Sequence, residues 1–256
     1  MSASLGRRAA AEAVGTALLL AVVVGSGIQA AELSRDAGVQ LLANSLASAF
    51  GLGVLIVLFG PVSGAHLNPV VTLAAWLSGR RAGTGPALRE VAAYIAAQVA
   101  GAIGGVVVAD AMFGKPLVRF STHDRSAGHL WLGEAVATGG LILLVFGLER
   151  IGRASLAPVA VAAYIGAGYW FTSSSSFANP ALTVGRVFTD TVAGISPASL
   201  VPFVAAQLAG AALGLGAVVL VYGRPVAAAA VVAAPLPGAT PDDVVGPHGE
   251  PELAAP

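Results

Sequence analysis

The chain has 256 residues, 56% of them hydrophobic and 10% charged, with a formal net charge of zero and a mean hydropathy of +0.83. This composition excludes an ordinary soluble domain and indicates an integral protein that crosses the bilayer several times. The sequence contains no cysteine, which excludes disulfides, thiol-ligated metals and thiol redox chemistry.

Six apolar segments are long enough to cross the ~30 Å hydrocarbon core as helices, and two shorter segments are predicted as half-helices. In chain order the segments are spans at 9–29 and 39–59, a half-helix at 69–79, spans at 87–109, 129–148 and 156–172, a half-helix at 180–189 and a span at 197–222. The predicted fold class is an all-α membrane protein. A tail at 223–256, rich in Pro and Ala, is expected to be disordered and dispensable for transport.

Each predicted half-helix begins at an Asn-Pro pair. The first motif is Asn68-Pro69-Val70 and the second is Asn179-Pro180-Ala181. Asn is a good N-cap, and Pro at the first helical position needs no N–H partner. Backbone that breaks at membrane depth is tolerated only where protein buries it or where it borders a wet cavity. The paired motifs therefore predict an aqueous path, rather than two ordinary loop-to-helix junctions at the membrane surface.

The sequence repeats itself. Glu12-Ala-Val-Gly-Thr in the first span returns as Glu134-Ala-Val-Ala-Thr in the fourth, and residues 96–102 parallel residues 205–211. Because each half holds three spans, the second half enters the membrane from the opposite face, which is inverted-repeat architecture. We predict a channel domain at 1–222 with repeats at about 9–109 and 129–222. This symmetry places the positive N-terminal ends of both half-helices at the membrane midplane.

Basic residues are distributed unevenly between the two sides of this arrangement. One side carries Arg7, Arg8, Arg80, Arg81, Arg89, Arg150, Arg153 and Arg224, and the other carries Arg35, Lys115, Arg119, Arg125 and Arg186. The positive-inside rule therefore predicts that both termini are cytoplasmic. We expect a multi-pass protein of a bacterial-type inner cell membrane.

Three titratable residues within apolar segments are candidates for function. Glu12 and Glu134 are expected to accept hydrogen bonds from the re-entrant backbone, the alternative being a carboxylate that reaches the interface from a span end. His66 either lines the inner half of the pore, where its charge would change with pH, or packs and bonds to the re-entrant backbone.

The segment Ser-Gly-Ala-His-Leu-Asn-Pro-Val-Val-Thr at 63–72, the motif at 179–181 and the paired Glu and Gln positions together resemble the aquaporin and aquaglyceroporin family of major intrinsic proteins. The resemblance covers about residues 9–222. It implies six spans, two re-entrant half-helices, a pore in every subunit and a homotetramer in the lipid bilayer. It also implies passive conduction of small neutral solutes, with the side chains of Asn68 and Asn179 offering amide donors to the passing oxygens.

The chain departs from most members of that family at the narrow outer filter. Where they carry Arg three residues after the second motif Asn, this chain has Leu182, and the resemblance places the remaining filter residues at Phe50, Ala167 and Ser176. Such a filter is expected to be wider and less polar than one that passes only water. Arg186, four residues beyond Leu182, is expected to compensate in part, unless it reaches the outer interface or pairs with Asp190.

Filters without that arginine, and the Ser-rich run at 171–177, are similar to bacterial aquaglyceroporins associated with arsenic resistance. The predicted solutes are therefore glycerol-like polyols, arsenous acid and water, which residue identities alone do not rank. A water-selective aquaporin is one alternative, and a proton-coupled secondary transporter is another, in which Glu12 and Glu134 would change protonation. No nucleophile–base pair, metal-ligand cluster or phosphate loop indicates an enzyme, and no cofactor or nucleic-acid partner is expected.

Overall fold

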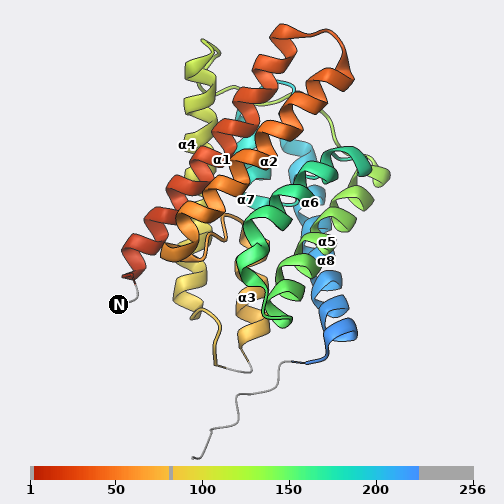
Figure 1. Ribbon diagram of the computed structural model, residues 1–256. Coiled ribbons are helices and arrows are strands. Elements are labelled where there is room, and N and C mark those ends of the chain that lie inside the picture. The colour runs from red at the N-terminus through yellow and green to blue at the C-terminus, as the bar shows by residue number, and fades with distance from the viewer. Residues whose placement is uncertain (1–2, 81–82, 225–256) are drawn as a thin grey trace, which may run out of the picture. The chain divides into compact units, whose positions relative to one another are not determined.

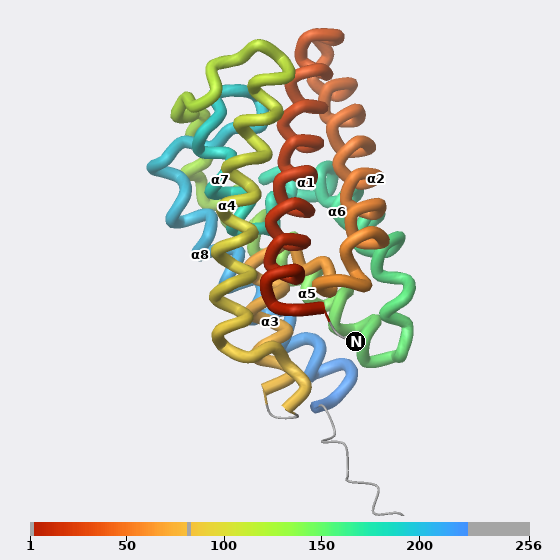
Figure 2. Tube along the Cα trace, turned by 90° about the vertical axis from the view of Figure 1, so that its left-hand side faces the viewer, coloured from red at the N-terminus to blue at the C-terminus, as the bar shows by residue number. Residues whose placement is uncertain are grey.

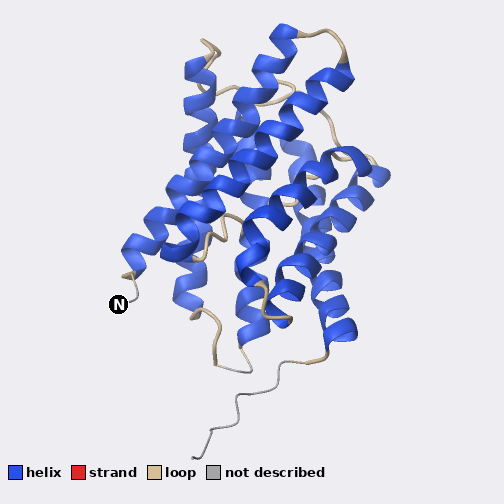
Figure 3. Ribbon diagram, viewed as in Figure 1, coloured by secondary structure: helices blue, strands red, loops and turns tan. Residues whose placement is uncertain are grey.

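A computed structural model describes residues 3–80 and 83–224 of the chain. Within these residues all regular structure is helical, as the fold class predicted (Figure 3). Six segments are long and apolar enough to cross a membrane: α1 (Leu5–Leu33), α2 (Ala37–Ser63), α4 (Leu88–Met112), α5 (Gly128–Arg150), α6 (Ala157–Phe171) with the preceding 3₁₀ turn η1 (Ala154–Leu156), and α8 (Pro197–Tyr222). Residues 225–256, which hold nearly all of the predicted tail, lie outside the described residues.

Two short helices begin inside the bundle. They are α3 (Pro69–Gly79) and α7 (Pro180–Gly185), the latter continued by the 3₁₀ turn η2 (Arg186–Phe188) (Figure 1). The second half-helix, expected at 180–189, is thus α-helical for only six residues before it tightens. Both short helices start with Pro directly after an Asn N-cap, as the sequence predicted.

The long helices pack as two equivalent pairs, α1 with α4 and α5 with α8. Figure 2 shows α1 lying between α4 and α2. A Cβ atom added at Gly105 of α4 would overlap the backbone carbonyl of Ala17 in α1, and one at Gly214 of α8 would overlap that of Gly139 in α5. Small residues therefore let both pairs of backbones approach closely, which membrane helices need because lipid supplies no hydrophobic drive for their association.

Replacing Gly105 by Val is expected to destabilise the bundle, because the added carbon meets a backbone oxygen that cannot rotate away. Overpacking typically lowers the free energy of unfolding by about 1–3 kcal/mol. Because the neighbouring backbone is rigid, we expect a loss at the upper end of this range. Gly104→Val is the matched control, since a Cβ at Gly104 meets nothing within 4 Å. Thermal unfolding followed by size-exclusion chromatography in detergent checks the pair, and equal transition temperatures would contradict the close-packing argument.

The start of α1 and the end of α8 lie at the same end of the bundle, here called the terminal end (Figure 1). The opposite end, here called the distal end, carries the segments 34–36, 113–127 and 189–196, which connect long helices or follow η2. The re-entrant segments that precede α3 and α7 enter from opposite ends, so that the two short helices begin near the middle of the bundle.

Candidate functional site

The two Asn-Pro motifs are held by capping bonds to their own helices. The side-chain oxygen of Asn68 accepts a hydrogen bond from the Val70 backbone N–H at 3.0 Å. That of Asn179 accepts from Ala181 at 3.0 Å and from Leu182 at 3.3 Å. Each asparagine thus satisfies backbone donors that the first helical turn leaves without intrahelical partners.

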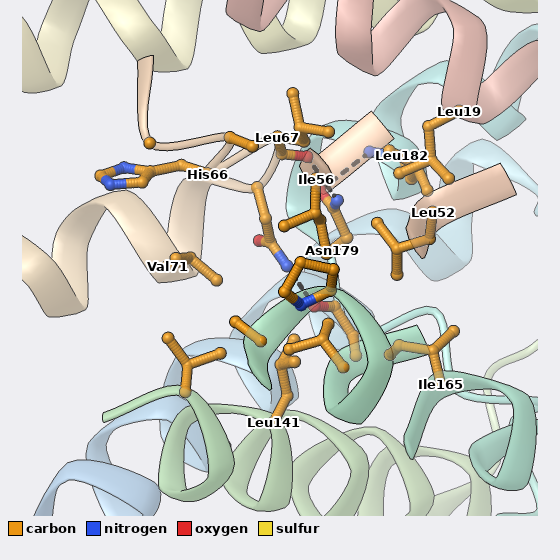
Figure 4. Close-up of a pocket in the computed structure, with 18 of the residues that line it drawn as sticks. Leu19, Leu52, Ile56, His66, Leu67, Val71, Leu141, Ile165, Asn179 and Leu182 are labelled. Atoms are coloured by element: carbon orange, nitrogen blue, oxygen red, sulfur yellow. Dashed lines mark hydrogen bonds between the residues drawn. The ribbon is translucent and has the colours of Figure 1, made fainter. Parts of the chain in front are cut away.

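The same two side chains also join the two halves of the chain. The Asn68 side-chain nitrogen donates to the carbonyl of Ala178, and the Asn179 side-chain nitrogen donates to the carbonyl of Leu67, each at 2.8 Å. Figure 4 shows Asn179 and Leu67 where the two re-entrant segments meet. Each amide nitrogen carries two hydrogens, so one donor per asparagine remains for a solute.

A buried carboxylate supports the first re-entrant segment. Glu12 is completely buried and accepts backbone hydrogen bonds from His66 at 3.0 Å and Leu67 at 2.6 Å. It also accepts from the Ser63 hydroxyl at 2.6 Å and the Gln98 amide at 2.7 Å. Four donors thus converge on one carboxylate, which ties the first re-entrant segment to α1 and α4.

The second segment has the equivalent support. Glu134 is also completely buried and accepts backbone hydrogen bonds from Phe177 and Ala178, each at 2.8 Å. The Gln207 amide donates to it at 2.6 Å and also reaches the Thr183 hydroxyl at 2.9 Å. Both glutamates are buried and do not extend to an interface. Each therefore supports the backbone of a re-entrant segment, as the sequence predicted.

The segments held in this way have strained backbones. The residues three and one positions before each motif asparagine have positive φ without being glycine: Ala65 (46°), Leu67 (47°), Ser176 (51°) and Ala178 (47°). A left-handed conformation costs a residue with a side chain about 1–2 kcal/mol, and such strain gathers at functional sites when surrounding bonds over-determine it. The alternation matches in the two halves, which marks both segments as parts of one site.

His66 has a defined tautomer because the single hydrogen of its partner hydroxyl, on Thr72, is already donated to another group. Thr72 Oγ1 donates to the carbonyl of Asn68 and accepts from the Gln98 amide, at 3.1 and 3.0 Å. The His66 Nδ1 atom, 3.1 Å from the same oxygen, must then be a donor. The other ring nitrogen of neutral His66 is left as an acceptor, and the residue lines the cavity described next.

A cavity of about 460 Å³ runs through the centre of the bundle, from the α5–α6 connection at the terminal end past both asparagines to Arg186. Its polar groups come mainly from the re-entrant segments. Most of the remaining wall is apolar and includes Leu52, Ile56, Val71, Leu141, Val145 and Ile165. A polar strip facing an apolar wall suits a solute that carries both hydroxyl groups and carbon.

A second cavity, of about 150 Å³, continues toward the distal end. It is lined partly by Gln40, Asn44 and Arg125. Three residues line both cavities and so mark the boundary between them, here called the constriction: Tyr169, Phe177 and Arg186. The two cavities therefore lie one after the other along the bundle, and together they are here called the path.

Arg186 dominates this constriction. Its side chain is only 5% exposed, and its guanidinium carbon lies 3.7 Å from the centroid of the Phe177 ring. Tyr169 lines both cavities as well, and its hydroxyl donates to the Ser48 hydroxyl at 2.9 Å. The two cavities can therefore bind polar molecules, and Arg186 places a positive charge between them.

No group of three or more His, Asp or Glu side chains among the described residues could hold a metal ion.

Comparison of the sequence with protein families identifies the class of protein that contains this path. The family described as Major intrinsic protein matches residues 1–176. The chain belongs to the major intrinsic protein family. Members of this family are channels and not enzymes, so the protein is a multi-pass membrane channel, as the sequence predicted.

Individual relatives agree with the family. The chain is 47% identical over 211 residues to aquaglyceroporin AqpS of Rhizobium meliloti, covering 82% of this chain and 88% of that protein. It is 30% identical over 269 residues to the glycerol uptake facilitator protein of Pseudomonas aeruginosa, covering 90% and 94%. The X-ray structure of the aquaglyceroporin from Plasmodium falciparum superposes with a TM-score of 0.64 at 19% identity, covering 83% of this chain and 93% of that one. This last similarity shows the aquaporin fold.

Of the four residues that the resemblance places at the filter of this major intrinsic protein, two line a cavity and two do not. Ser176 and Leu182 line the larger cavity, at 3% and 7% exposure. Phe50 is 70% exposed and Ala167 is also exposed, and neither lines a cavity. Assigning these two residues to the filter was wrong.

Helical periodicity explains both errors. The cavity face of α2 carries Ser48, Leu52 and Ile56, and that of α6 carries Ile165 and Tyr169, at intervals of four residues. A residue two positions from these points about 200° away around the helix, toward the opposite face. The four-residue spacing of apolar and small residues was a usable signal for Ser48 and Tyr169.

The alternative expectation for Arg186, that it reaches the outer interface or pairs with an acidic neighbour, was wrong. Arg186 neither reaches an interface nor pairs with Asp190, whose carboxylate lies 3.3 Å from Arg119. It lies on the path instead, one turn beyond Leu182. Phe177 and Arg125 were not anticipated, and for Phe177 the available signal was its place two residues before Asn179.

Proposed function

We propose that this channel passively conducts small uncharged solutes, namely glycerol-like polyols, arsenous acid and water. The observation that carries the proposal is the larger cavity, in which Asn68 and Asn179, each with one amide hydrogen left free, share the lining with a largely apolar wall. A polyol can exchange hydrogen bonds along the polar strip while its carbons contact Ile56 and Val71. The similarity to an aquaglyceroporin and to a glycerol uptake facilitator supports this solute class.

Cations are excluded by charge as well as by dehydration. The helices that start at Pro69 and Pro180 direct their positive ends at the middle of the path. Arg186 adds a formal positive charge at the constriction. A cation would lose its hydration shell in a region of positive potential, whereas a neutral solute would not.

The width proposed for the path rests on small and aliphatic side chains. Leu182 occupies the position where most members of the family carry arginine, and Ser176 lines the same cavity. Arsenous acid is a small neutral trihydroxy molecule, similar in shape to glycerol, and would pass where glycerol does. The chain contains no thiol to trap it.

The hydrogen bonds of the glutamates argue against the proton-coupled transporter. Both oxygens of Glu12 accept from donors, including the backbone N–H groups of His66 and Leu67. Protonating either oxygen would place an O–H against a backbone N–H, which cannot reverse its role. A water-selective channel remains the second candidate, because the charged constriction at Arg186 narrows the path.

The remaining assignments complete the proposal. The channel domain spans 1–222, both termini are cytoplasmic in a bacterial-type inner membrane, and four copies form a homotetramer. The midplane motifs are Asn68-Pro69-Val70 and Asn179-Pro180-Ala181. Large apolar side chains exposed on α2, such as Val54 and Leu58, fit a surface that faces lipid or another subunit.

Stopped-flow light scattering on proteoliposomes tests the function by comparing glycerol and water flux, with arsenite uptake measured in the same vesicles. We expect glycerol and arsenite to cross the vesicle membrane at rates that do not depend on a pH gradient. We expect no sodium flux. Val71→Trp, on the cavity wall, is expected to reduce solute flux at least about tenfold, whereas Val136→Trp, half exposed on the outside of α5, is expected not to. Fast water flux with glycerol excluded would establish the water-selective alternative.

A further inference from the structure

Two arginine side chains share the distal cavity. Arg186 reaches it from η2 and Arg125 from the α4–α5 connection, and their guanidinium carbons lie 3.7 and 4.8 Å from the centroid of the same Phe177 ring. The two cations come from segments about sixty residues apart in the chain, so the fold itself brings like charges together. Two cations held close together in a confined cavity raise the question of what neutralises them.

No carboxylate in the described part of the chain forms a salt bridge with either arginine. The charge of Glu134 acts on Arg125 and opposes the lowering of its pKa, but the oxygens of Glu134 accept hydrogen bonds from backbone and amide donors instead. Asp190 is bound to Arg119 and to Thr122. The ring of Phe177 attracts both cations but carries no charge to neutralise them.

The hydrogen-bonding capacity of the two guanidinium groups is also incompletely used. The Arg186 Nε atom is buried and has no hydrogen-bond partner among the described residues. Arg125 donates from Nε to the carbonyl of Gly194 at 3.1 Å, which leaves its two terminal nitrogens for the cavity. Burial and the nearby Arg186 charge lower the pKa of Arg125 to about 10, and it therefore remains protonated at neutral pH.

Neutral side chains on the opposite wall supply acceptors. Asn44 uses its amide nitrogen for the Val23 carbonyl and the Ser26 hydroxyl, both at 2.8 Å. Gln40 donates from its amide nitrogen to the Ser34 carbonyl at 2.7 Å. Since both hydrogens of the Asn44 amide are used, only its carbonyl oxygen remains, and that atom can bind an O–H group.

We propose that the distal cavity is a binding site for a small hydroxylated oxyanion, such as monobasic phosphate or a hydroxycarboxylate. Arg125 and Arg186 bind its charged oxygens, and Asn44 accepts from its hydroxyl group. Because the site lies in series with the larger cavity, a bound anion obstructs the path and reduces neutral-solute flux. This last step rests on the proposed function, whereas the binding itself does not.

Binding is tested first, without transport. Purified protein in detergent is titrated with sodium phosphate, sodium glycolate, sodium acetate or sodium chloride at constant ionic strength, and thermal unfolding is followed. We expect phosphate or glycolate to raise the transition temperature, acetate to act more weakly because it lacks the hydroxyl group, and chloride to have no effect. The relative response to phosphate and glycolate identifies the oxyanion class.

Matched arginine variants locate the site. Arg125→Gln is expected to weaken binding about tenfold, because one charge-assisted partner is lost. Arg119→Gln is the control, since Arg119 belongs to the same connection but is largely exposed and pairs with Asp190. Arg125→Lys keeps the positive charge. If Arg125→Gln fails to bind the anion, retained binding by Arg125→Lys shows that the lost charge is the cause rather than misfolding. Equal binding by Arg125→Gln and Arg119→Gln, or equal effects of chloride and phosphate, would overturn the proposal.

Transport then tests the obstruction. The effective anion, present at equal concentration on both sides of the vesicle membrane, is expected to lower glycerol flux through the wild type and Arg119→Gln more strongly than through Arg125→Gln. A thermal response without any glycerol flux would contradict the proposed function and leave the anion site standing. Glycerol flux without a thermal response or inhibition would contradict the anion site alone.

Discussion

Replacing Leu182 by Arg is expected to lower glycerol flux about tenfold or more. Leu182 lines the larger cavity at 7% exposure, one turn from Arg186. A second guanidinium there would both fill the path and place like charges in the same narrow region. A tenfold reduction corresponds to an increase of about 1.4 kcal/mol in the barrier to permeation, which is small for the insertion of a charged side chain into the path.

The measurement is the initial rate of glycerol-driven swelling per reconstituted protein. Leu182→Met is the control, because it keeps the volume and apolar character of the side chain and is expected to retain most of the flux. Water flux measured on the same vesicles shows whether the variant is folded and narrowed or simply inactive. A folded Leu182→Arg channel that conducts glycerol at the wild-type rate would contradict the assignment of Leu182 to the path.

Replacing Glu134 by Ala is expected to destabilise the protein by about 2–6 kcal/mol. The change removes the acceptor for the buried backbone N–H groups of Phe177 and Ala178, and each buried donor left without a partner costs about 1–3 kcal/mol. The Ala178 backbone, held at a φ of 47°, would lose the bond that maintains it. Glycerol flux is expected to decrease as well, because less of the protein is folded.

Thermal unfolding in detergent, with recovery of the monodisperse peak, measures this loss. Glu32→Ala is the matched control, because Glu32 is exposed and pairs only with Lys115 at the surface. Glu134→Gln keeps one acceptor oxygen and is expected to lie between the two. If Glu134→Ala unfolded at the same temperature as Glu32→Ala, the carboxylate would not be what holds the second re-entrant segment.

The sequence was sufficient for the framework of the channel because the relevant signals are local and strong. Long apolar runs specify spanning helices whatever surrounds them, and an Asn-Pro pair specifies a helix start through the cap and the missing N–H. Asn68 and Asn179 could therefore be placed correctly at the starts of α3 and α7. Their reciprocal bonds to Ala178 and Leu67 could not, because they depend on how the two halves meet.

The lining of the narrow region was harder to predict, since it depends on the rotation of each helix about its axis. Phe50 was chosen for its size, but Ser48 faces the cavity and Phe50 faces outward. Arg186 was recognised by its spacing from Leu182, which holds even though α7 gives way to a 3₁₀ turn at that point. Arg125 lies in an irregular connection, where sequence spacing carries no information about which cavity a side chain enters.

The reciprocal bonds between the two motifs also have a consequence for how the protein is made. The Leu67 carbonyl and the Asn68 amide lie in the first half of the chain, but their partners, at Asn179 and Ala178, are synthesised more than a hundred residues later. Glu12 can hold the first segment meanwhile, because all of its partners lie within the first 98 residues. The hydrogen bonds at the middle of the path can therefore form only after the ribosome has passed residue 179, and a nascent N-terminal half in the membrane lacks half of the groups that line it.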